Sequence, residues 1–199
     1  TRIESDLIGA REIPAEALYG VQTLRGIENF SISKFRLSEY PLFIKGLAIT
    51  KMAAAMANFE LGLLTVEQKD AIIAACGEIL DGKHHDQFPV DMIQGGAGTT
   101  TNMNANEVIA NRALELMGHE RGEYQYCSPN DHVNCSQSTN DAYPTAIHIG
   151  MYFKHLQLLP HLEELIASFR KKGEEFSQII KMGRTQLEDA VPMTLGQTF

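Results

Sequence analysis

The amino-acid sequence predicts a mainly α fold in two parts: a small helical N-terminal domain over residues 1–139, and the first long helix of a central helix bundle over residues 140–199. Apolar residues recur at helical spacing in three segments between residues 41 and 117. A fourth such segment, residues 138–180, would span about 60 Å as a helix at ~1.5 Å per residue. Short helices cannot cover the apolar side of such a rod. We therefore expect a helix bundle whose other rods are absent from this chain.

Glycine and proline interrupt the regions between these segments. In the first forty residues they stand at Gly9, Pro14, Gly20 and Gly26. Such residues break periodic structure, so we predict an irregular start, with a short strand or a turn of helix in residues 17–30. Residues 83–98 and 119–131 are predicted to be loops.

Start and stop signals frame the three shorter helices. Pro41 suits the first turn of the first helix, and Gly62 suits its end. Thr65 is the predicted N-cap of the second helix, with Gln68 as its capping-box partner. The third helix begins near residue 99, and Gly118 is placed to follow its last turn.

The long segment contains two prolines. Pro144 lies near its start, whereas Pro160 lies inside it and is expected to kink or briefly break the helix. Gly183 is the predicted end of this helix, and residues 184–199 read as a loop followed by another helix.

Composition and charge exclude several classes of protein. The net charge is −8, so no basic field exists to bind nucleic acid or an anionic membrane. No apolar run reads as a membrane span, and the charged N-terminus lacks the apolar core of a signal peptide. Three cysteines without a CxxC pair favour a reducing, cytoplasmic setting over a disulfide framework. Adjacent His84 and His85 cannot share one helical face, so we expect no metal site.

Three polar stretches lie where helices are predicted to begin or end. In "QGGAGTTTNMNANE", residues 94–107, glycines precede a helix N-terminus. This pattern indicates either an anion-binding site or redundant N-capping by the threonines of the first turn. In "SPNDHVNCSQSTND", residues 128–141, one side chain is enough for a cap, and the others form a donor array for a carboxylate. Its "SPND" is equally typical of an Asx turn. The third stretch, "MGRTQLEDAVP", is weak when taken alone.

In their order along the chain, these three stretches resemble the aspartase/fumarase superfamily, and within it the aspartases most. The resemblance extends from "DLIGAREIPAEALYG" to Phe199. It implies a small N-terminal domain, a central bundle of very long helices and a small C-terminal domain. It also implies a homotetramer in which each active site draws its motifs from three subunits.

Motif positions of the family place its substrate-binding groups on Thr99, Ser138, Thr139, Asn140 and Thr185. Four further residues are possible contributors: Gln186, Asn130, Asp131 and His132. Fumarases typically carry His where this chain has Gln186, so aspartase is favoured. The family resemblance implies no cofactor.

The resemblance implies reversible elimination of ammonia from L-aspartate, a small dicarboxylate, giving fumarate through an aci-carboxylate intermediate. The alternatives are a fumarate hydratase or another succinyl-type lyase, and, from another class, a non-catalytic oligomerisation module. In the family the catalytic base is a serine within a Gly-Ser-Ser-x-Met-Pro-x-Lys-x-Asn pattern. That pattern does not occur in residues 1–199, so we expect this chain alone to be inactive.

Overall fold

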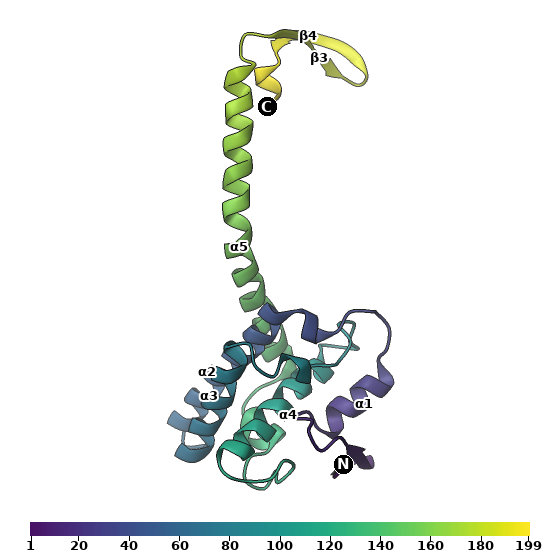
Figure 1. Cartoon of the computed structure of the whole chain (residues 1–199), viewed down its shortest axis with the longest axis vertical. Coiled ribbons are helices and arrows are strands. Elements are labelled where there is room, and N and C mark those ends of the chain that lie inside the picture. The colour runs from purple at the N-terminus through teal and green to yellow at the C-terminus, as the bar shows by residue number, and fades with distance from the viewer. The chain divides into compact units, whose positions relative to one another are not determined.

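A computed structural model describes every residue from Thr1 to Phe199 (Figure 1). The chain divides into two compact units, Thr1–Tyr152 and Phe153–Phe199. Each unit is described by itself below. The predicted mainly α class is confirmed, although two β-hairpins accompany the helices.

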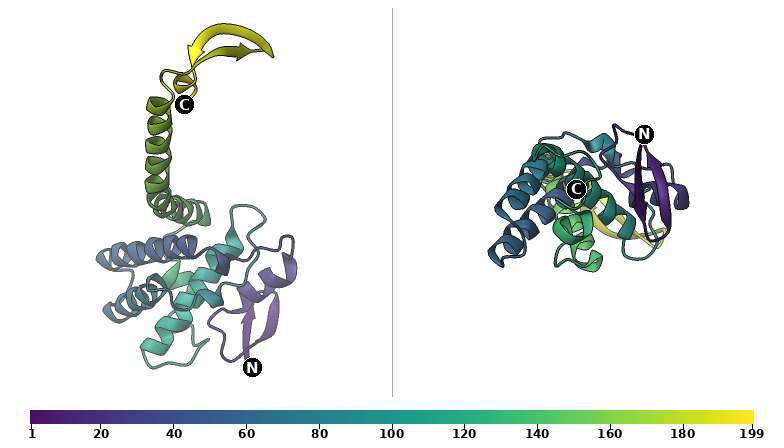
Figure 2. Two further views of the ribbon diagram at one scale, coloured as in Figure 1. Left: turned by 45° about the horizontal axis from the view of Figure 1, so that its top comes forward. Right: turned by 90° about the horizontal axis from the view of Figure 1, so that it is seen from below.

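Three helices form the core of the first unit: α2 (Pro41–Glu60), α3 (Val66–Leu80) and α4 (Thr99–Leu116). α3 packs against both α2 and α4 (Figures 1 and 2). Their fully buried side chains include Ile44, Leu47, Ile72, Ile79, Ile109 and Leu114. Burial of this apolar surface is the main force that holds the three helices together.

The starts of these helices follow the predicted signals. Pro41 occupies the first turn of α2. Thr65 caps α3 in a capping box with Gln68, each side chain accepting from the other residue's backbone N–H. Gly118 follows α4 with a φ of 82°, a left-handed conformation that glycine adopts without strain.

The first forty residues hold more regular structure than predicted. Strands β1 (Arg2–Asp6) and β2 (Gly9–Ile13) form an antiparallel hairpin in which Glu4 faces Arg11. Helix α1 (Val21–Asn29) then lies within the range predicted for a strand or a helical turn. A 3₁₀ turn, η1 (Leu37–Glu39), precedes α2. The strands were missed because side chains elsewhere in the sequence hold them in place.

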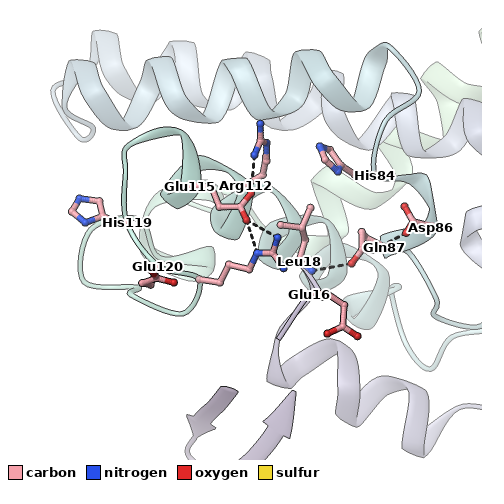
Figure 3. A pocket seen from close by; sticks show the side chains of 10 residues that line it. Glu16, Leu18, His84, Asp86, Gln87, Arg112, Glu115, His119 and Glu120 are labelled. Carbon is pink, nitrogen blue, oxygen red and sulfur yellow. Dashed lines mark hydrogen bonds and ion pairs between the residues drawn. The ribbon is translucent and has the colours of Figure 1, made fainter. Parts of the chain in front are cut away.

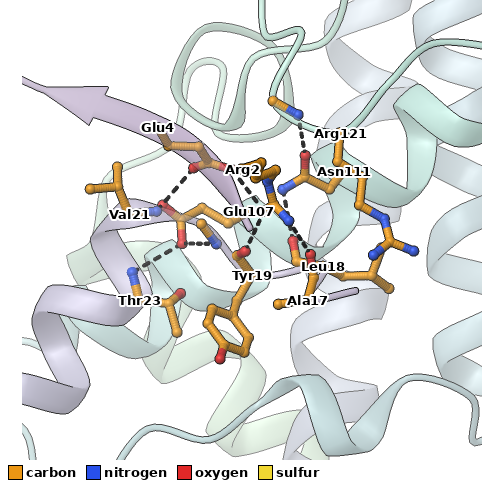
Figure 4. A network of polar contacts seen from close by, with 12 residues as sticks. Arg2, Glu4, Ala17, Leu18, Tyr19, Val21, Thr23, Glu107, Asn111 and Arg121 are labelled. Atoms are coloured by element: carbon orange, nitrogen blue, oxygen red, sulfur yellow. Dashed lines mark hydrogen bonds and ion pairs between the residues drawn. The ribbon is translucent and has the colours of Figure 1, made fainter. Parts of the chain in front are cut away.

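Arg2 is one of these anchors (Figure 4). Its guanidinium donates to the backbone oxygens of Ala17 at 2.6 Å and Tyr19 at 2.7 Å, and it pairs with Glu4 at 2.7 Å. The hairpin is thereby tied to the segment that leads into α1. A guanidinium with several planar donors is well suited to join separate chain segments.

Glu107, buried in α4, joins α1 to the core (Figure 4). The N-cap residue Gly20 has no side chain to pair the first N–H groups of α1. The Glu107 carboxylate accepts instead, from the backbone N–H groups of Gly20 at 2.8 Å, Gln22 at 2.8 Å and Thr23 at 3.0 Å. Burial raises the pKa of Glu107, against the lowering effect of these hydrogen bonds.

The loop after α3 carries one 3₁₀ turn, η2 (His85–Gln87). A π-helical turn, η3 (Pro129–Val133), follows α4. Helix α5 (Thr139–Glu175) begins in the first unit and continues into the second. The boundary predicted between residues 139 and 140 stays a prediction about the full-length protein.

α5 crosses α2 so closely that no side chain separates the two backbones. A Cβ at Gly46 would clash with the carbonyl oxygen of Ala146, and one at Gly150 would lie 3.1 Å from that of Leu42. Both contacts lie within the first unit. Glycine suits both positions because backbone atoms of the facing helix occupy the space that a methyl group would fill.

The C-terminal part of the second unit differs from the prediction. α5 ends at Glu175, uninterrupted at Pro160, and does not extend to Gly183. Strands β3 (Ile180–Thr185) and β4 (Glu188–Thr194) form an antiparallel hairpin, followed by a 3₁₀ turn, η4 (Gly196–Thr198). The predicted loop and helix over residues 184–199 were therefore wrong. The short apolar run before the hairpin fits helical and strand spacing equally well, and strand pairing decides between them.

α2 also corrects one expectation from the sequence. Its 20 residues have the length and mean hydropathy, 1.3, of a helix that could cross a membrane. In the structure α2 packs against α3 and α4 and buries Lys51 within the first unit. Core helices of globular domains share this composition, so length and hydropathy alone decide nothing here.

The helix crossing generates a stability prediction. Gly46→Ala should lower the free energy of unfolding by about 1–3 kcal/mol, because the added methyl group forces α5 away from α2. Gly77→Ala is the matched control: it lies within α3 with no atom within 4 Å of the new Cβ. The control should raise stability by roughly 0.5–1 kcal/mol through helix propensity. Urea unfolding measures both, and equal effects of the two variants would contradict the close crossing.

Candidate functional site

Two of the predicted polar stretches meet in the first unit. Asn102, in the first turn of α4, donates its side-chain amide to the hydroxyl oxygen of Thr139, the first residue of α5, at 3.2 Å. One turn further along α5, the ring of Tyr143 covers Gly98, where a Cβ would lie 2.5 Å from it. The N-termini of α4 and α5 are therefore neighbours, and their dipoles add positive potential in one place.

The start of α4 lacks a side-chain cap. Its N-cap is Gly98, with a φ of 82°, and no side chain accepts from its first N–H groups. Thr99 is exposed, whereas Thr100 packs under Gly26 of α1 and Thr101 is buried. Redundant N-capping by the threonines is therefore not what the structure contains. The exposed Thr99 thus lies beside backbone N–H groups that no side chain caps.

The start of α5 divides its polar residues between two tasks. Ser138 caps the helix, because its hydroxyl oxygen accepts from the backbone N–H of Asn140 at 3.2 Å. Thr139 is half-buried against Asn102, and Asn140 exposes its amide. Ser138 alone is sufficient as the cap, so the side chains of Thr139 and Asn140 are not needed for capping.

The "SPND" segment begins the π-helical turn η3, with Ser128 as its N-cap. Ser128 accepts from the backbone N–H of Asp131 at 3.1 Å, and the Nδ1 atom of His132 accepts from the N–H of Ser128 at 2.7 Å. Burial lowers the pKa of His132, consistent with a neutral ring that accepts at Nδ1. His132 thus stabilises the turn, whereas Asn130 and Asp131 are exposed.

A cavity of about 620 Å³ lies between η3, the first hairpin, the start of α1 and the middle of α4. Of the predicted site residues, only Asn130 lines it. Two charged residues that line it, Asp6 and Glu107, are paired with protein groups. The cavity is therefore separate from the donors gathered at the starts of α4 and α5.

Thr185 and Gln186 belong to the second unit. Thr185 ends β3, and Gln186 and Leu187 form the two-residue turn to β4 with φ values of 49° and 65°. Such a turn favours Asn-Gly, so Gln and Leu there are strained. Strained backbone of this kind gathers at functional positions, and both Thr185 and Gln186 are exposed.

Sequence reasoning missed a buried lysine behind the site. Lys51, in the middle of α2, is 0% exposed. Its amine donates to the side-chain oxygens of Asn134 at 2.9 Å and Gln137 at 3.0 Å. A lysine inside the apolar run "AITKMAAAM" was the available signal, because lysine is rarely fully buried without a partner.

The structure buries three asparagines of α4. Asn102, Asn104 and Asn106 are each at most 1% exposed. Their side-chain oxygens have no hydrogen-bond partner in the protein. Buried amides in such numbers are costly unless they serve contacts that hold or shape a site.

A second cavity, of about 550 Å³, is lined by charged side chains away from the helix starts (Figure 3). Arg112 pairs with Glu78 and Glu115, and Arg121 also pairs with Glu115. No predicted site residue lines this cavity, and its arginines are already paired. No group of three or more His, Cys, Asp or Glu side chains is placed to hold a metal ion.

Comparisons with known proteins agree with the motifs. The sequence profile of the lyase family matches residues 9–199. Curated aspartate ammonia-lyases from Pseudomonas canavaninivorans and Helicobacter pylori strain J99 are each 61% identical over 198 residues, and that of Escherichia coli strain K12 is 59% identical over 199 residues. These matches cover 100% of this chain and 42% of each relative. The chain thus spans less than half the length of the curated relatives it matches.

Solved structures agree with the fold. A fumarate lyase:delta crystallin from Brucella melitensis, in native form, has a TM-score of 0.91 and 55% sequence identity, covering 100% of this chain and 45% of that one. A class II fumarase from Schistosoma mansoni has a TM-score of 0.88 and 40% identity, covering 99% and 41%.

The charged cavity generates a pH prediction. Hydrogen bonds from Arg112 lower the pKa of Glu78 from 4.5 to about 2. Since the folded pKa lies below the unfolded one, the stabilisation is complete above about pH 4.5 and is lost as the pH falls toward 2. Glu78→Gln should therefore flatten the loss of stability between pH 5 and pH 3 in urea unfolding. Glu60→Gln, at an exposed position of α2, should keep the wild-type slope.

Proposed function

Because this chain belongs to the lyase family, we propose that it forms part of an aspartate ammonia-lyase, which converts L-aspartate reversibly to fumarate and ammonia. The observation that carries the proposal is 59–61% identity to aspartate ammonia-lyases along the whole chain. The N-termini of α4 and α5, which meet at Asn102 and Thr139, offer hydrogen-bond donors suited to a carboxylate substrate. The proposal concerns the full-length protein.

The chemistry requires a place for extra negative charge. Elimination of ammonia removes a weakly acidic proton from the carbon next to a carboxylate, leaving an aci-carboxylate with two negative oxygens. Donors that meet this charge as it develops lower the barrier more than donors that bind the ground state. Neutral hydroxyl, amide and backbone N–H groups at helix starts supply such donors without a metal.

We infer that Thr99, Ser138, Thr139 and Asn140 bind the substrate. Thr99 and Asn140 are exposed and have no side-chain partner in the protein. The oxygens of Ser138 and Thr139 each accept a protein hydrogen bond, which leaves their hydroxyl protons to donate outward. Asn130 and Asp131 are further candidates for contact with an incoming ligand, whereas His132 acts through the turn that it stabilises.

We infer that Thr185 and Gln186 join this site from another subunit of a homotetramer. The strained turn that presents them supports a binding role. On α5 in the second unit, large apolar side chains remain exposed at helical spacing: Leu158, Leu162, Leu165, Ile166 and Phe169. Such a face calls for neighbouring helices. The serine base is expected from a segment outside residues 1–199, and the isolated chain is expected to be inactive.

The cytoplasm is the proposed location. Cys76, Cys127 and Cys135 are all free thiols, and two of them are buried. Burial raises the pKa of Cys76 and of Cys127 to about 12, so both thiols are neutral and unreactive. Free cysteines of this kind are typical of a reducing compartment.

One alternative keeps the fold and changes the reaction. The class II fumarase of Schistosoma mansoni shares this fold at 40% identity, so hydration of fumarate is the competing reaction. Gln186 favours ammonia elimination, because fumarases typically place a histidine there. The full-length protein should release ammonia and fumarate from L-aspartate and form no L-malate from fumarate. Absorbance of fumarate and an ammonia assay measure both, and formation of malate would favour the alternative.

A substitution separates catalysis from mere assembly. Thr139→Val in the full-length protein removes one donor at constant shape and should lower kcat by about a hundredfold or more. Its oligomeric state in size-exclusion chromatography should not change. Thr50→Val, which removes a hydroxyl bonded within α2, is the matched control and should keep turnover. Full activity of Thr139→Val would support a non-catalytic oligomerisation role instead.

A further inference from the structure

The buried amine of Lys51 lies behind the loop that leads into α5. Its two hydrogen-bond acceptors, Asn134 and Gln137, stand 83 and 86 residues further along the chain. Both acceptors are amide oxygens, not carboxylates. A lysine at this position is costly to bury, and methionine or leucine would fill the same volume without that cost. The role of the amine is therefore to be sought in the orientation of its two acceptors, Asn134 and Gln137.

An amine can only donate to an amide oxygen, so Lys51 determines how both amides face. With their oxygens toward Lys51, their nitrogens turn into the loop. The amide of Asn134 donates to the carbonyl of Gln137 at 3.0 Å, and that of Gln137 donates to the carbonyl of Val133 at 2.8 Å. Between the two amides, Ser136 has a φ of 57°, a strained value for a residue with a side chain. The loop keeps this shape because the lysine holds both of its sides.

The orientation passes on to the site. The oxygen of Asn134 that accepts from Lys51 also accepts from the amide of Asn102 at 3.1 Å. The same amide nitrogen of Asn102 donates to the hydroxyl oxygen of Thr139 at 3.2 Å. A hydroxyl whose oxygen accepts from the protein interior keeps its own proton for the other side. The chain of contacts from Lys51 thus ends by turning the Thr139 proton outward.

We propose, on the basis of the proposed function, that Lys51 is a positioning residue for substrate binding. Through Asn134 and Asn102 it sets the direction in which the Thr139 hydroxyl donates. Lys51 touches no substrate in this arrangement. Its role is to keep one donor of the carboxylate site aimed before substrate arrives, and preorganisation of this kind raises rates.

The surroundings of the Lys51 amine favour a role as a fixed hydrogen-bond donor rather than as a reacting group. Burial lowers the pKa of Lys51 to about 7. The nearby thiol of Cys76 in α3 is neutral, because burial raises its pKa to about 12. A neutral amine retains two N–H donors, which are enough for both amide oxygens, so the contact persists on either side of pH 7.

The test uses the full-length protein and Lys51→Met, which removes the donors and keeps an unbranched side chain of similar length. Lys51→Met should lower kcat/KM for L-aspartate by about tenfold or more, since a donor is misaimed. Amide hydrogen exchange in residues 134–142 should also become faster. Asn58→Leu is the matched control: Asn58 is buried on the same helix and binds the same loop at the carbonyl of Cys135, but has no link to Thr139. The control should lower stability and leave KM unchanged.

A double-mutant cycle distinguishes positioning from general destabilisation. If Lys51 acts through Asn102, then Lys51→Met combined with Asn102→Ala should lower kcat/KM by about tenfold, not by the roughly hundredfold product of independent effects. Additive losses would overturn the proposal, as would an unchanged KM and exchange rate in Lys51→Met. If Lys51→Met does not fold, Asn102→Ala alone must produce the loss in kcat/KM, and its absence is equally decisive.

Failure of the proposed function gives a different result. In that case the unsubstituted protein releases no ammonia from L-aspartate, whereas the exchange measurement still reports on the loop. Faster exchange in Lys51→Met but not in Asn58→Leu would then keep the structural part of the proposal. Equal exchange in both variants would remove it.

Discussion

The unpaired N–H groups at the start of each helix are the constraint around which this protein is organised. An α-helix leaves its first donors without partners, and several helices here meet that requirement in different ways. α1 uses the buried carboxylate of Glu107, α3 uses its own capping box, and α5 uses Ser138. α4 begins at a glycine with no side-chain cap. Its first N–H groups have no side-chain acceptor and lie beside the start of α5.

α4 carries the contacts that connect this site to the rest of the first unit. Asn102 binds the start of α5 and Asn104 the carbonyl of Gln87, while Glu107 and Asn111 bind the segments around α1. A core helix with so many buried polar groups gives up apolar stabilisation. In exchange it specifies one arrangement of its neighbours, because a misplaced amide or carboxylate would be left without a partner.

The parts of the fold that the sequence predicts are those with local causes. Apolar periodicity predicts α2, α3 and α4, and Pro41 and the pair Thr65 and Gln68 mark the starts of the first two. The two hairpins do not, because the first depends on distant contacts such as those of Arg2, and the second turns through Gln186 and Leu187 instead of the usual Asn-Gly. The same division holds for the site. The proposed threonines and asparagines come from motif positions, whereas the contact of Lys51 with Asn134 exists only in the folded chain, 83 residues apart in sequence.

The glycine joint between α2 and α5 has a consequence for how the protein can vary. With backbone against backbone at Gly46 and Gly150, no side chain at the joint is available to absorb a substitution by changing rotamer. The two helices cannot slide freely along each other, because a shift by one turn would place bulkier residues against a backbone carbonyl. A substitution of either glycine must therefore separate the two helices, since no smaller adjustment makes room for a side chain. The position of Thr139 along the axis of α5 is therefore fixed relative to α2 by backbone contact, not by side chains that a substitution could reshape.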